Sequence, residues 1–473
     1  MSPFGFPDAA ERARRAAEAR LRAHDWPPAL LTILRTLQEG GAQAHLVGGP
    51  VRDLLLGRTL DKAWDVATSL TPDQVRARFS RIEGVGEKHG TVLIVEAGLL
   101  IECTTFRLEG EYTDARRPDQ VWYTDDAVQD LARRDLTVNA MAFDPLTGTL
   151  LDPFGGALDL ERRRLRAVGD PLDRLTEDAL RALRVARFAA TLEMEVDADT
   201  RAAMAEVVER ARGLAVERVR IELEKMLAAP RPSVGLEMLR EAGLMTLWLP
   251  EVEAGYRVGQ NRFHAYDVYW HSLHTCDAAP VDKPLVRWAA LLHDIGKPAT
   301  RVMRDDGQAS FHNHERVGAE MADRLLDRLR FSNVQREHIV HLVREHMFDY
   351  RAVWSDGAVR RFIRRVGPDH IADLFDLRMS DSIGNGLKTP DVERLEAFAA
   401  RIERLMSADG AFSVGDLAIG GGEVMEVLGL EPGPAVGDAL DALLEAVLED
   451  PSLNTPEGLR ALLEAHRHHP GRA

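Results

Sequence analysis

The chain has 473 residues, of which 45% are hydrophobic, and its formal net charge at pH 7 is −16. That length exceeds what one hydrophobic core supports, so we expect about two to four domains. The acidic balance excludes a uniformly basic nucleic-acid-binding protein. Arginines nevertheless gather locally in ARRPDQ, LARRDL, ERRRLR and EDALRALRVARF, so a basic surface on an acidic protein is expected.

The sequence carries no segment typical of membrane insertion or secretion. The apolar run VLIVEAGLLIECTTF is broken by Glu96 and Glu102, and the start, MSPFGFPDAAERARRAAEARLRAHDW, has no apolar core. The two cysteines, Cys103 and Cys276, form no metal or disulfide pattern, which suits a reducing compartment. We therefore expect a cytoplasmic protein with no membrane partner.

Five segments are predicted in chain order. Residues 1–27 are expected to form a charged helical extension, and residues 28–150, with β-rich runs such as AHLVGG and TVLIVEA, a small α/β head. Residues 151–231 have apolar residues at three- and four-residue spacing, which predicts an amphipathic helical neck. Residues 232–385 predict a His-rich helical body and residues 386–473 a helical tail. The predicted class is α+β, a mixed head followed by all-helical regions.

The stretch LVGGPVRDLLLG is typical of a strand that ends at a glycine pair, Gly48 and Gly49, followed by a helix that begins near Pro50. Glycines let a phosphate approach the backbone, and a helix start offers free N–H donors. Arg52 is a candidate phosphate ligand, and Asp53 could brace it. A plain strand–turn–helix without a ligand would give the same pattern.

The next predicted strand, WDVAT, carries a carboxylate pattern with a gap. Two carboxylates at positions i and i+2 of a strand project to one side and can hold two Mg²⁺ ions. Asp65 supplies one, but Ala63 stands where its partner would be, and Asp61 lies about 13 Å away along an ideal strand. Glu102, in LLIECTTFR, is a third candidate. Its alternative interpretation is an edge-strand glutamate that faces water.

Seven motifs occur in a fixed order between Leu46 and Phe188: LVGGPVRDLLLGR, WDVATS, ECTTFR, EYTDARRPDQV, RRDLTVNAMAFD, DPFGG and EDALRALRVARF. In this order they resemble the class II tRNA nucleotidyltransferases and bacterial poly(A) polymerases of the polymerase-β superfamily. The resemblance covers roughly residues 28–260.

The resemblance implies a metal-dependent polymerase site with Mg²⁺ as cofactor. Asp65 and Glu102 match the second and third acidic positions of the family, and Ala63 replaces the first. Losing one ligand of a two-metal centre is expected to remove most catalysis and to leave substrate binding intact. Because the neighbouring motifs are intact, we favour a deliberate Asp-to-Ala replacement at position 63 over natural divergence.

RRDLTVNA resembles the ribose-recognition motif of the family, which implies that Arg134, Asp135 and Asn139 contact the nucleotide. Aspartate and asparagine side chains can hydrogen-bond sugar hydroxyls. The alternative is an aspartate cap at a helix start, followed by an amphipathic helix; both interpretations can hold together.

EDALRALRVARF resembles the motif that selects the base. Asp178 and Arg181, three residues apart, are expected on one helix face, where acceptor and donor mimic a complementary base edge, with Arg184 as companion. The alternative is a surface ion pair. In VERVRIELEKML, Arg218 and Glu222 resemble a motif that steadies this helix, and their alternative is an ordinary surface pair one turn apart.

EYTDARRPDQV matches the flexible loop of the family. There Arg116 and Arg117 are expected to contact the triphosphate or to help the switch from C to A addition. The alternative is a solvated charged loop. Enzymes that add CCA, CC only or A only share all these motifs, and the sequence does not choose among them.

The His-rich body contains LLHDIGKP, in which a His–Asp pair follows an apolar run. Imidazole and carboxylate ligands in the order H…HD…D suit a divalent metal and resemble the HD phosphohydrolases. The candidate ligands for one or two metals are His271, His293, Asp294, His314, His346 and Asp381. Lys297 could engage a phosphate. Ligand types alone do not choose among Mn²⁺, Ni²⁺, Co²⁺ and Mg²⁺.

The leading prediction is a template-independent transferase that adds C and/or A to tRNA 3′ ends from CTP and ATP and releases pyrophosphate, with a phosphohydrolase in the HD domain. A poly(A) polymerase is the competitor, but that family usually carries a basic tail and this tail is acidic. A different class, an HD phosphohydrolase with an RNA-binding, non-catalytic head, is supported by Ala63. A non-enzymatic RNA-binding protein is the fourth alternative. The sequence does not predict the oligomeric state.

Overall fold

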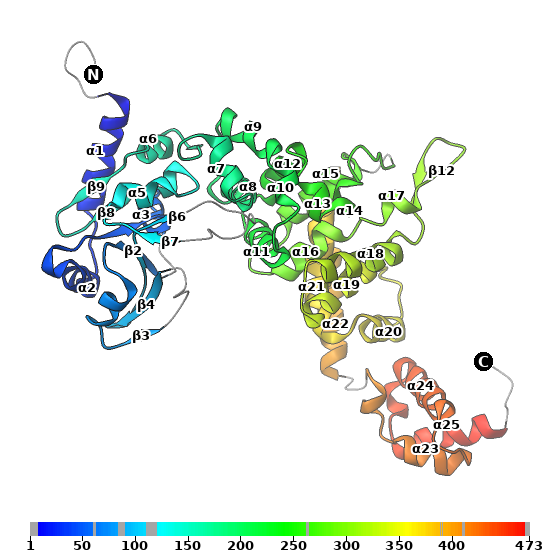
Figure 1. Cartoon of the computed structure of the whole chain (residues 1–473). Helices are drawn as coiled ribbons and strands as arrows, with labels where there is room; N and C mark the ends of the chain where they lie inside the picture. Colours follow the sequence, from blue (N-terminus) through cyan, green and yellow to red (C-terminus); the bar gives the residue numbers. More distant parts are fainter. Residues whose placement is uncertain are drawn as a thin grey trace. The chain divides into compact units, whose positions relative to one another are not determined.

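The structure, a computed structural model of the chain, describes residues 8–59, 63–83, 90–109, 121–261, 264–387, 389, 391–408 and 412–468. It divides into two compact units, Met1–Glu253 and Ala254–Ala473, drawn from blue to green and from green to red in Figure 1. Asp61, Arg116 and Arg117 lie outside the described residues. The domain boundaries after residues 27, 150, 231 and 385 stay predictions.

A mixed seven-stranded sheet forms the head, in the order β3-β4-β5-β2-β1-β8-β9. Its strands are β1 (Ala44–Val47), β2 (Trp64–Thr68), β3 (Ile82–Glu83), β4 (Thr91–Glu96), β5 (Leu99–Thr105), β8 (Ala142–Asp144) and β9 (Thr149–Leu151). Only β2 and β5 pair in parallel within this sheet. Four shorter strands pair outside it: β6 (Arg107–Glu109), β7 (Val121–Tyr123), β10 (Arg164–Leu165) and β11 (Glu195–Val196).

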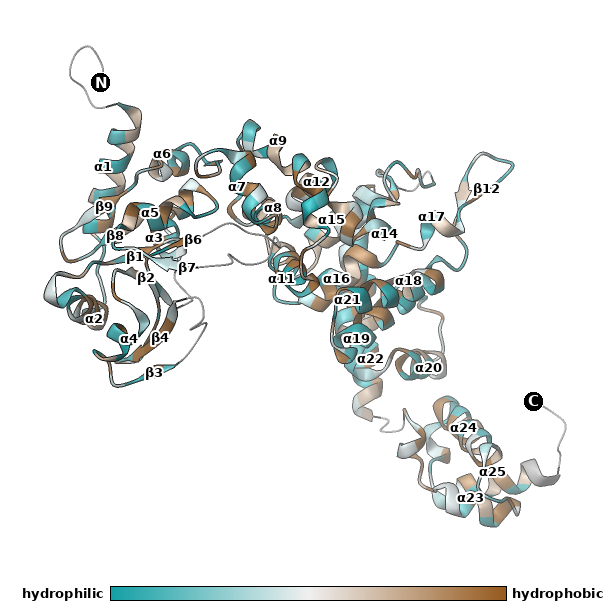
Figure 2. Ribbon diagram, viewed as in Figure 1, coloured by the Kyte–Doolittle hydropathy of each residue, from teal (hydrophilic) through white to brown (hydrophobic). Residues whose placement is uncertain are grey.

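The period of two along β5 decides which side chain faces the core. Ile101 and Cys103 are buried, and Glu102 between them is exposed on the opposite face. β5 lies between β4 and β2, so it is an interior strand. The alternative interpretation, that Glu102 sits on an edge strand, is therefore wrong. The neighbouring β4 is almost entirely apolar and appears brown in Figure 2.

Helices make up the rest of the first unit. They are α1 (Ala9–Arg22), α2 (Pro28–Gln38), α3 (Gly49–Leu55), α4 (Pro72–Arg76), α5 (Ala127–Ala132), α6 (Gly156–Glu161), α7 (Pro171–Glu177), α8 (Leu180–Leu192), α9 (Ala198–Glu206), α10 (Val208–Ala211), α11 (Val216–Leu227), α12 (Pro232–Glu241), α13 (Met245–Trp248) and α14 (Pro250–Glu253). In α11, Val219, Leu223 and Met226 form the buried stripe that the spacing predicted. α8 packs against α11 and α12.

The second unit is helical. Its helices are α15 (Val268–Ala278), α16 (Pro284–Leu292), α17 (Lys297–Thr300), α18 (His314–Arg328), α19 (Asn333–Glu345), α20 (Asp356–Val366), α21 (Ile371–Gly384), α22 (Val392–Ala408), α23 (Gly421–Leu428), α24 (Pro434–Glu449) and α25 (Pro456–His468). α16 is buried along nearly its whole length and packs against α15, α19 and α21. One short hairpin, β12 (Val302–Met303) and β13 (Ala309–Ser310), follows α17. The predicted α+β class is confirmed.

The acidic tail helix α24 is held by arginines of α20. Arg361 pairs with Glu449, and Arg364 pairs with Asp441 and Glu445. Arg360 also donates to the carbonyl of Leu448. Part of the negative charge of the tail is therefore neutralised within the unit. None of the helices in the described ranges is long and apolar enough to cross a membrane.

Candidate active sites

The residues predicted for the nucleotide site line one cavity of about 740 Å³ in the first unit. They are Gly48, Gly49, Arg52, Ala63, Asp65, Glu102, Arg134, Asp135, Asn139, Asp178, Arg181 and Arg184. They come from β2, β5, α3, α8 and the connections next to these elements. The fold therefore brings together segments that are distant in the sequence.

The turn between β1 and α3 requires glycine. Gly48 has a φ of 69°, and a Cβ added there would lie 2.7 Å from Nη1 of Arg134. The Cβ position of Gly49 lies 4.0 Å from Oδ2 of Asp65. The bare backbone thus lets a carboxylate and a guanidinium lie close to the start of α3.

The two carboxylates predicted to bind metal are direct neighbours. Asp65 on β2 is in register with Glu102 on the parallel strand β5, so both side chains project to the same face and line the cavity. Ala63 comes just before β2 and lines the same cavity. Carboxylate oxygens are the donors that Mg²⁺ prefers, so Asp65 and Glu102 fit this ion. An alanine at position 63 offers no donor.

A chain of hydrogen bonds links polar side chains that line the cavity. Arg52 donates from Nη1 to Oδ1 of Asn139 (2.5 Å), and Asn139 donates from Nδ2 to Oδ1 of Asp135 (2.9 Å). Arg184 donates from Nε to the second oxygen of Asp135 (2.8 Å). Asp53 braces Arg52 through two contacts of 2.9 Å. The arrangement fixes the direction of each side chain.

Asp135 is ionised in this network. Burial favours its neutral form, but the charge of Arg184 and the hydrogen bonds from Asn139 and Arg184 outweigh burial and hold its pKa well below the usual range. The segment after it is a single 3₁₀ turn, Thr137–Asn139. The alternative of an amphipathic helix after Asp135 is therefore wrong, because the chain turns directly into β8.

Asp178 and Arg181 do not share a helix face. α7 ends before Asp178, whose backbone is extended (φ −141°), and α8 begins two residues later. Asp178 accepts a hydrogen bond from Nη2 of Arg218 (2.7 Å). Arg181 donates to the carbonyls of Arg174 (2.8 Å) and Arg133 (2.9 Å). The prediction of a pair on one face was wrong, although both residues line the cavity.

Glu222 is buried, so the alternative of a surface pair with Arg218 is also wrong. Its Oε2 accepts from Nε of Arg187 at 2.5 Å, and its Oε1 lies 3.8 Å from Nη1 of Arg184. The guanidinium of Arg187 stacks 3.8 Å from the ring centre of Phe188, which also lines the cavity. Sequence reasoning missed Arg187 and Phe188, although they follow Arg184 directly in RVARF.

The Glu222→Gln variant is expected to lower the free energy of unfolding by about 3 kcal/mol, because it leaves the partly buried Arg187 without its counter-charge. Hydrogen exchange of α8 amides during a urea titration measures the change locally. Glu217→Gln, on the exposed side of the same helix, is the matched control and is expected to change stability by less than about 0.5 kcal/mol. Equal effects of the two substitutions would contradict this account.

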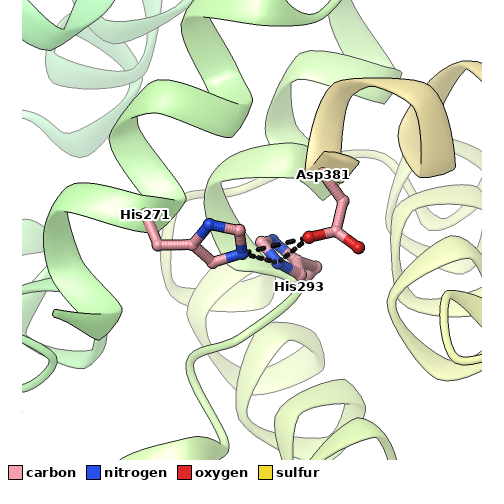
Figure 3. A group of neighbouring side chains, drawn as sticks. All are labelled: His271, His293 and Asp381. Carbon is pink, nitrogen blue, oxygen red and sulfur yellow. Dashed lines mark hydrogen bonds and ion pairs between the residues drawn. The ribbon is translucent and has the colours of Figure 1, made fainter. Parts of the chain in front are cut away.

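The six predicted HD ligands meet in the second unit as two groups, His271–His293–Asp381 and Asp294–His314–His346. Figure 3 shows the first group, in which His271 from α15 and Asp381 from α21 point toward the ring of His293. Oδ1 of Asp381 lies 3.1 Å from Nε2 of His271, and the two imidazole nitrogens lie 3.2 Å apart.

Asp294 connects the two groups. Its Oδ2 lies 3.2 Å from Nε2 of His293 and 3.4 Å from Nε2 of His271. Its Oδ1 lies 3.3 Å from Nε2 of His314 and 3.8 Å from Nε2 of His346. A carboxylate with one oxygen on each side suits two divalent ions bridged by one residue. The imidazole and carboxylate donors fit a divalent metal ion.

The backbone orients the imidazole rings. Nδ1 of His293, His314 and His346 lies within 2.8 Å of the carbonyls of Ala290, Phe311 and Val343, respectively. These contacts assign the proton to Nδ1 and leave Nε2 free to bind metal. Burial, together with the charge of His293, lowers the pKa of His346 to about 3, so this ring is neutral at neutral pH.

The Lys297 side chain contacts the same group of candidate metal ligands. Its Nζ donates to Oδ2 of Asp294 (2.6 Å) and to Gln260 (2.7 Å). Burial would raise the pKa of Asp294, but the charges of His293 and Lys297 hold it well below the usual value. A cavity of about 490 Å³ opens above His293, Asp294 and Lys297.

The sequence matches three family profiles: "Poly A polymerase head domain" over residues 44–166, "Probable RNA and SrmB- binding site of polymerase A" over residues 193–255, and "HD domain" over residues 263–378. A CCA-adding enzyme of Streptococcus gordonii is 31% identical over 437 residues, which cover 92% of this chain and 96% of that relative. The chain belongs to the class II tRNA nucleotidyltransferase and poly(A) polymerase family.

Within the family, an A-adding tRNA nucleotidyltransferase of Deinococcus radiodurans is 37% identical over 347 residues, 71% of this chain and 78% of that relative. The CCA-adding enzyme of Levilactobacillus brevis is 45% identical over 212 residues. That match covers 45% of this chain and 53% of the relative, so it spans about half the relative's length. The structure of the Bacillus stearothermophilus CCA-adding enzyme, solved with CTP, is similar at a TM-score of 0.72 and 28% identity, over 94% of this chain and 99% of that one.

Proposed function

We propose that the first unit is a template-independent tRNA nucleotidyltransferase that transfers C and/or A from CTP and ATP to the tRNA 3′ end and releases pyrophosphate. The in-register pair of Asp65 and Glu102, beside the Arg52–Asn139–Asp135 network in one cavity, carries the proposal. CCA-adding and A-adding relatives along most of the chain support it.

The carboxylates and the arginines have different roles in the proposed reaction. Asp65 and Glu102 would hold Mg²⁺, which supplies activation of the attacking hydroxyl and stabilisation of the leaving phosphates. Arg52 and Arg184 present guanidinium donors that suit a triphosphate. In this proposal Asp135 and Asn139 accept and donate hydrogen bonds with ribose hydroxyls.

Base selection rests on Asp178 in this proposal. Arg218, not Arg181, holds the Asp178 carboxylate in place from α11. Arg181 is anchored to two backbone carbonyls, so its position is fixed when a base enters the cavity. An oriented carboxylate next to a fixed guanidinium supports recognition of a base edge by side chains rather than by a nucleic-acid template.

We further propose that Ala63 impairs catalysis without disturbing the cavity. The glycine turn, both remaining carboxylates and the arginine network are all present around it. Among the described residues of the cavity, position 63 lacks the carboxylate that the family pattern has there. Whether position 63 was altered deliberately or diverged naturally is decided by the sequence of the native gene.

Equilibrium binding tests the proposal independently of catalysis. The unaltered chain is expected to bind CTP, ATP or both more tightly than GTP and UTP. Asp178→Ala is expected to reduce this discrimination by about tenfold or more, because it removes the acceptor that reads the base. Asp173→Ala, on the exposed first turn of α7, is the control and should leave discrimination unchanged. Equal binding of all four nucleotides by the unaltered chain would overturn the proposal.

The second unit supports a second function, hydrolysis of phosphoesters. The observation that favours it is the pair of three-residue ligand groups joined by Asp294. A phosphomonoesterase acting on RNA 3′-phosphates would leave the 3′-hydroxyl to which the head adds nucleotides. A 2′,3′-cyclic phosphodiesterase would open a cyclic end to a phosphomonoester, which the phosphomonoesterase activity would then remove.

The C-terminal tail bears on which RNA the protein binds. The tail helix α24 is acidic and lies against α20, which favours tRNA over the long RNA products of a poly(A) polymerase.

We place the protein in the cytoplasm, because both cysteines are free thiols in the structure and a reducing compartment keeps them so.

A further inference from the structure

The hairpin β12–β13 follows one ligand candidate of the HD centre in the chain and precedes another. It lies in the chain between Asp294, which connects the ligand groups, and His314. Its turn is closed by hydrogen bonds from the Arg304 amide to the Gln308 carbonyl (2.9 Å) and from the Gly307 amide to the Arg304 carbonyl (3.0 Å). Gly307 has a φ of 77°, as the last residue of a three-residue hairpin loop requires. The hairpin is therefore a defined element.

This hairpin forms a wall of the 490 Å³ cavity. Arg304, Asp306 and Gln308 line the cavity together with the metal-ligand candidates His293 and Asp294 at its base. Arg304 and Gln308 face each other across the two strands, so their side chains project to the same side of the hairpin. A molecule bound at the ligand groups thus meets the hairpin as it extends outward.

The cations of the cavity have different partners. Lys297 contacts Asp294 at 2.6 Å, and Arg378 contacts Asp381 at 3.0 Å. Arg304 is exposed and forms no ion pair within the part of the chain that the structure describes. The charges of Lys297 and Arg378 are matched by carboxylates of the centre. The guanidinium of Arg304 is available for an anion of the ligand.

We propose that Arg304 is a specificity-determining residue of the HD centre and selects substrates with a second phosphate beyond the one that is hydrolysed. The substrate class is an RNA end whose terminal phosphate lies at the ligand groups while the next phosphodiester pairs with Arg304. An arginine binds a phosphate through two parallel hydrogen bonds and charge. The inference rests on the phosphohydrolase activity proposed above.

The reaction consumes one water. The terminal phosphorus–oxygen ester bond is broken, the phosphorus gains the oxygen of water, and the ester oxygen leaves with a proton. The products are inorganic phosphate and an RNA end with a free hydroxyl. Arg304 takes no part in these bond changes; it pairs with the phosphodiester on the 5′ side of the terminal nucleotide.

Binding tests the inference without turnover. The probe is a fluorescent diribonucleotide with a non-hydrolysable 3′-methylphosphonate, titrated with the full chain in Mn²⁺. Arg304→Ala is expected to raise Kd by about tenfold and to lower the slope of log Kd against log salt by about 0.7, the loss of one single-strand phosphate contact. Arg301→Ala is the matched control, because Arg301 is exposed three residues earlier and does not line the cavity. Equal Kd values for the two variants would overturn the inference.

Hydrolysis assays with two substrates distinguish the role of Arg304 from the phosphohydrolase activity itself. The unaltered chain with Mn²⁺ or Ni²⁺ is expected to hydrolyse both p-nitrophenyl phosphate and a diribonucleotide 3′-phosphate. Arg304→Ala should raise KM about tenfold for the dinucleotide only, and Arg304→Lys should recover part of the loss. If the unaltered chain hydrolyses both substrates and Arg304→Ala changes neither activity, Arg304 has no such role. If the unaltered chain hydrolyses neither substrate, the phosphohydrolase activity itself fails, and this inference fails with it.

Discussion

The Ala63→Asp variant is expected to transfer nucleotides faster than the unaltered chain by about a hundredfold or more. Position 63 lines the cavity beside Asp65 and Glu102, so an aspartate there supplies the missing carboxylate. Metal-assisted charge stabilisation is worth several kcal/mol, and about 1.4 kcal/mol corresponds to a factor of ten in rate. Release of pyrophosphate from CTP and ATP in the presence of tRNA and Mg²⁺ measures the gain.

Ala63→Asn separates charge from volume in the same test. Asparagine has nearly the size of aspartate but no negative charge, so it should recover little of the rate. CTP and ATP affinities of the three chains should agree within about twofold, because the arginine network is unchanged. A rate gain for Asn equal to that for Asp would show that the missing charge is not the defect.

Asp294→Asn is expected to abolish the HD centre as a two-metal site. Asp294 is the residue whose two oxygens lie next to both ligand groups. Its replacement should lower the metal content of Mn²⁺-loaded protein from two equivalents, one for each group, to one or none. Hydrolysis of p-nitrophenyl phosphate should fall by about a hundredfold or more. Elemental analysis of the dialysed protein measures the first effect.

The matched control is Asp282→Asn, which lies on an exposed loop of the same unit. It should retain both metal equivalents and full hydrolysis. Nucleotide transfer by the first unit should also be unchanged by Asp294→Asn in the Ala63→Asp background, since each cavity is built within one unit. Retention of two equivalents by Asp294→Asn would contradict the assignment of Asp294 as the bridging ligand.

The sequence predicted the parts of the site that depend on local periodicity. Alternation along β5 places Glu102 opposite Ile101 and Cys103, and the glycine pair marks a turn in which Gly48 has a left-handed backbone that favours glycine. The HD ligands were predicted from residue types and order, because a His–Asp pair after an apolar helix is rare. In each case the chemistry of a short segment determines the local geometry.

The sequence did not predict interactions between distant segments. Arg218 and Asp178 are 40 residues apart, and Arg187 and Glu222 are 35 apart. An arginine can pair with any nearby carboxylate, so the partner depends on how α8 and α11 pack. Asp178 was predicted to be helical, yet its side chain accepts from the Leu180 amide and its backbone stays extended. That local hydrogen bond competes with continuation of the helix, so α7 ends before Asp178.

The most direct test of the central proposal is incorporation of labelled CTP and ATP into tRNAs that end before, within and after the CC of their 3′ end. The Ala63→Asp chain is assayed beside the unaltered chain with Mg²⁺. The account predicts that Ala63→Asp extends tRNAs that lack terminal nucleotides and that the unaltered chain binds them with little extension. The lengths of the products then show whether the enzyme adds C, A or both. If neither chain adds a nucleotide to any of these tRNAs although both bind them, the transferase proposal is wrong.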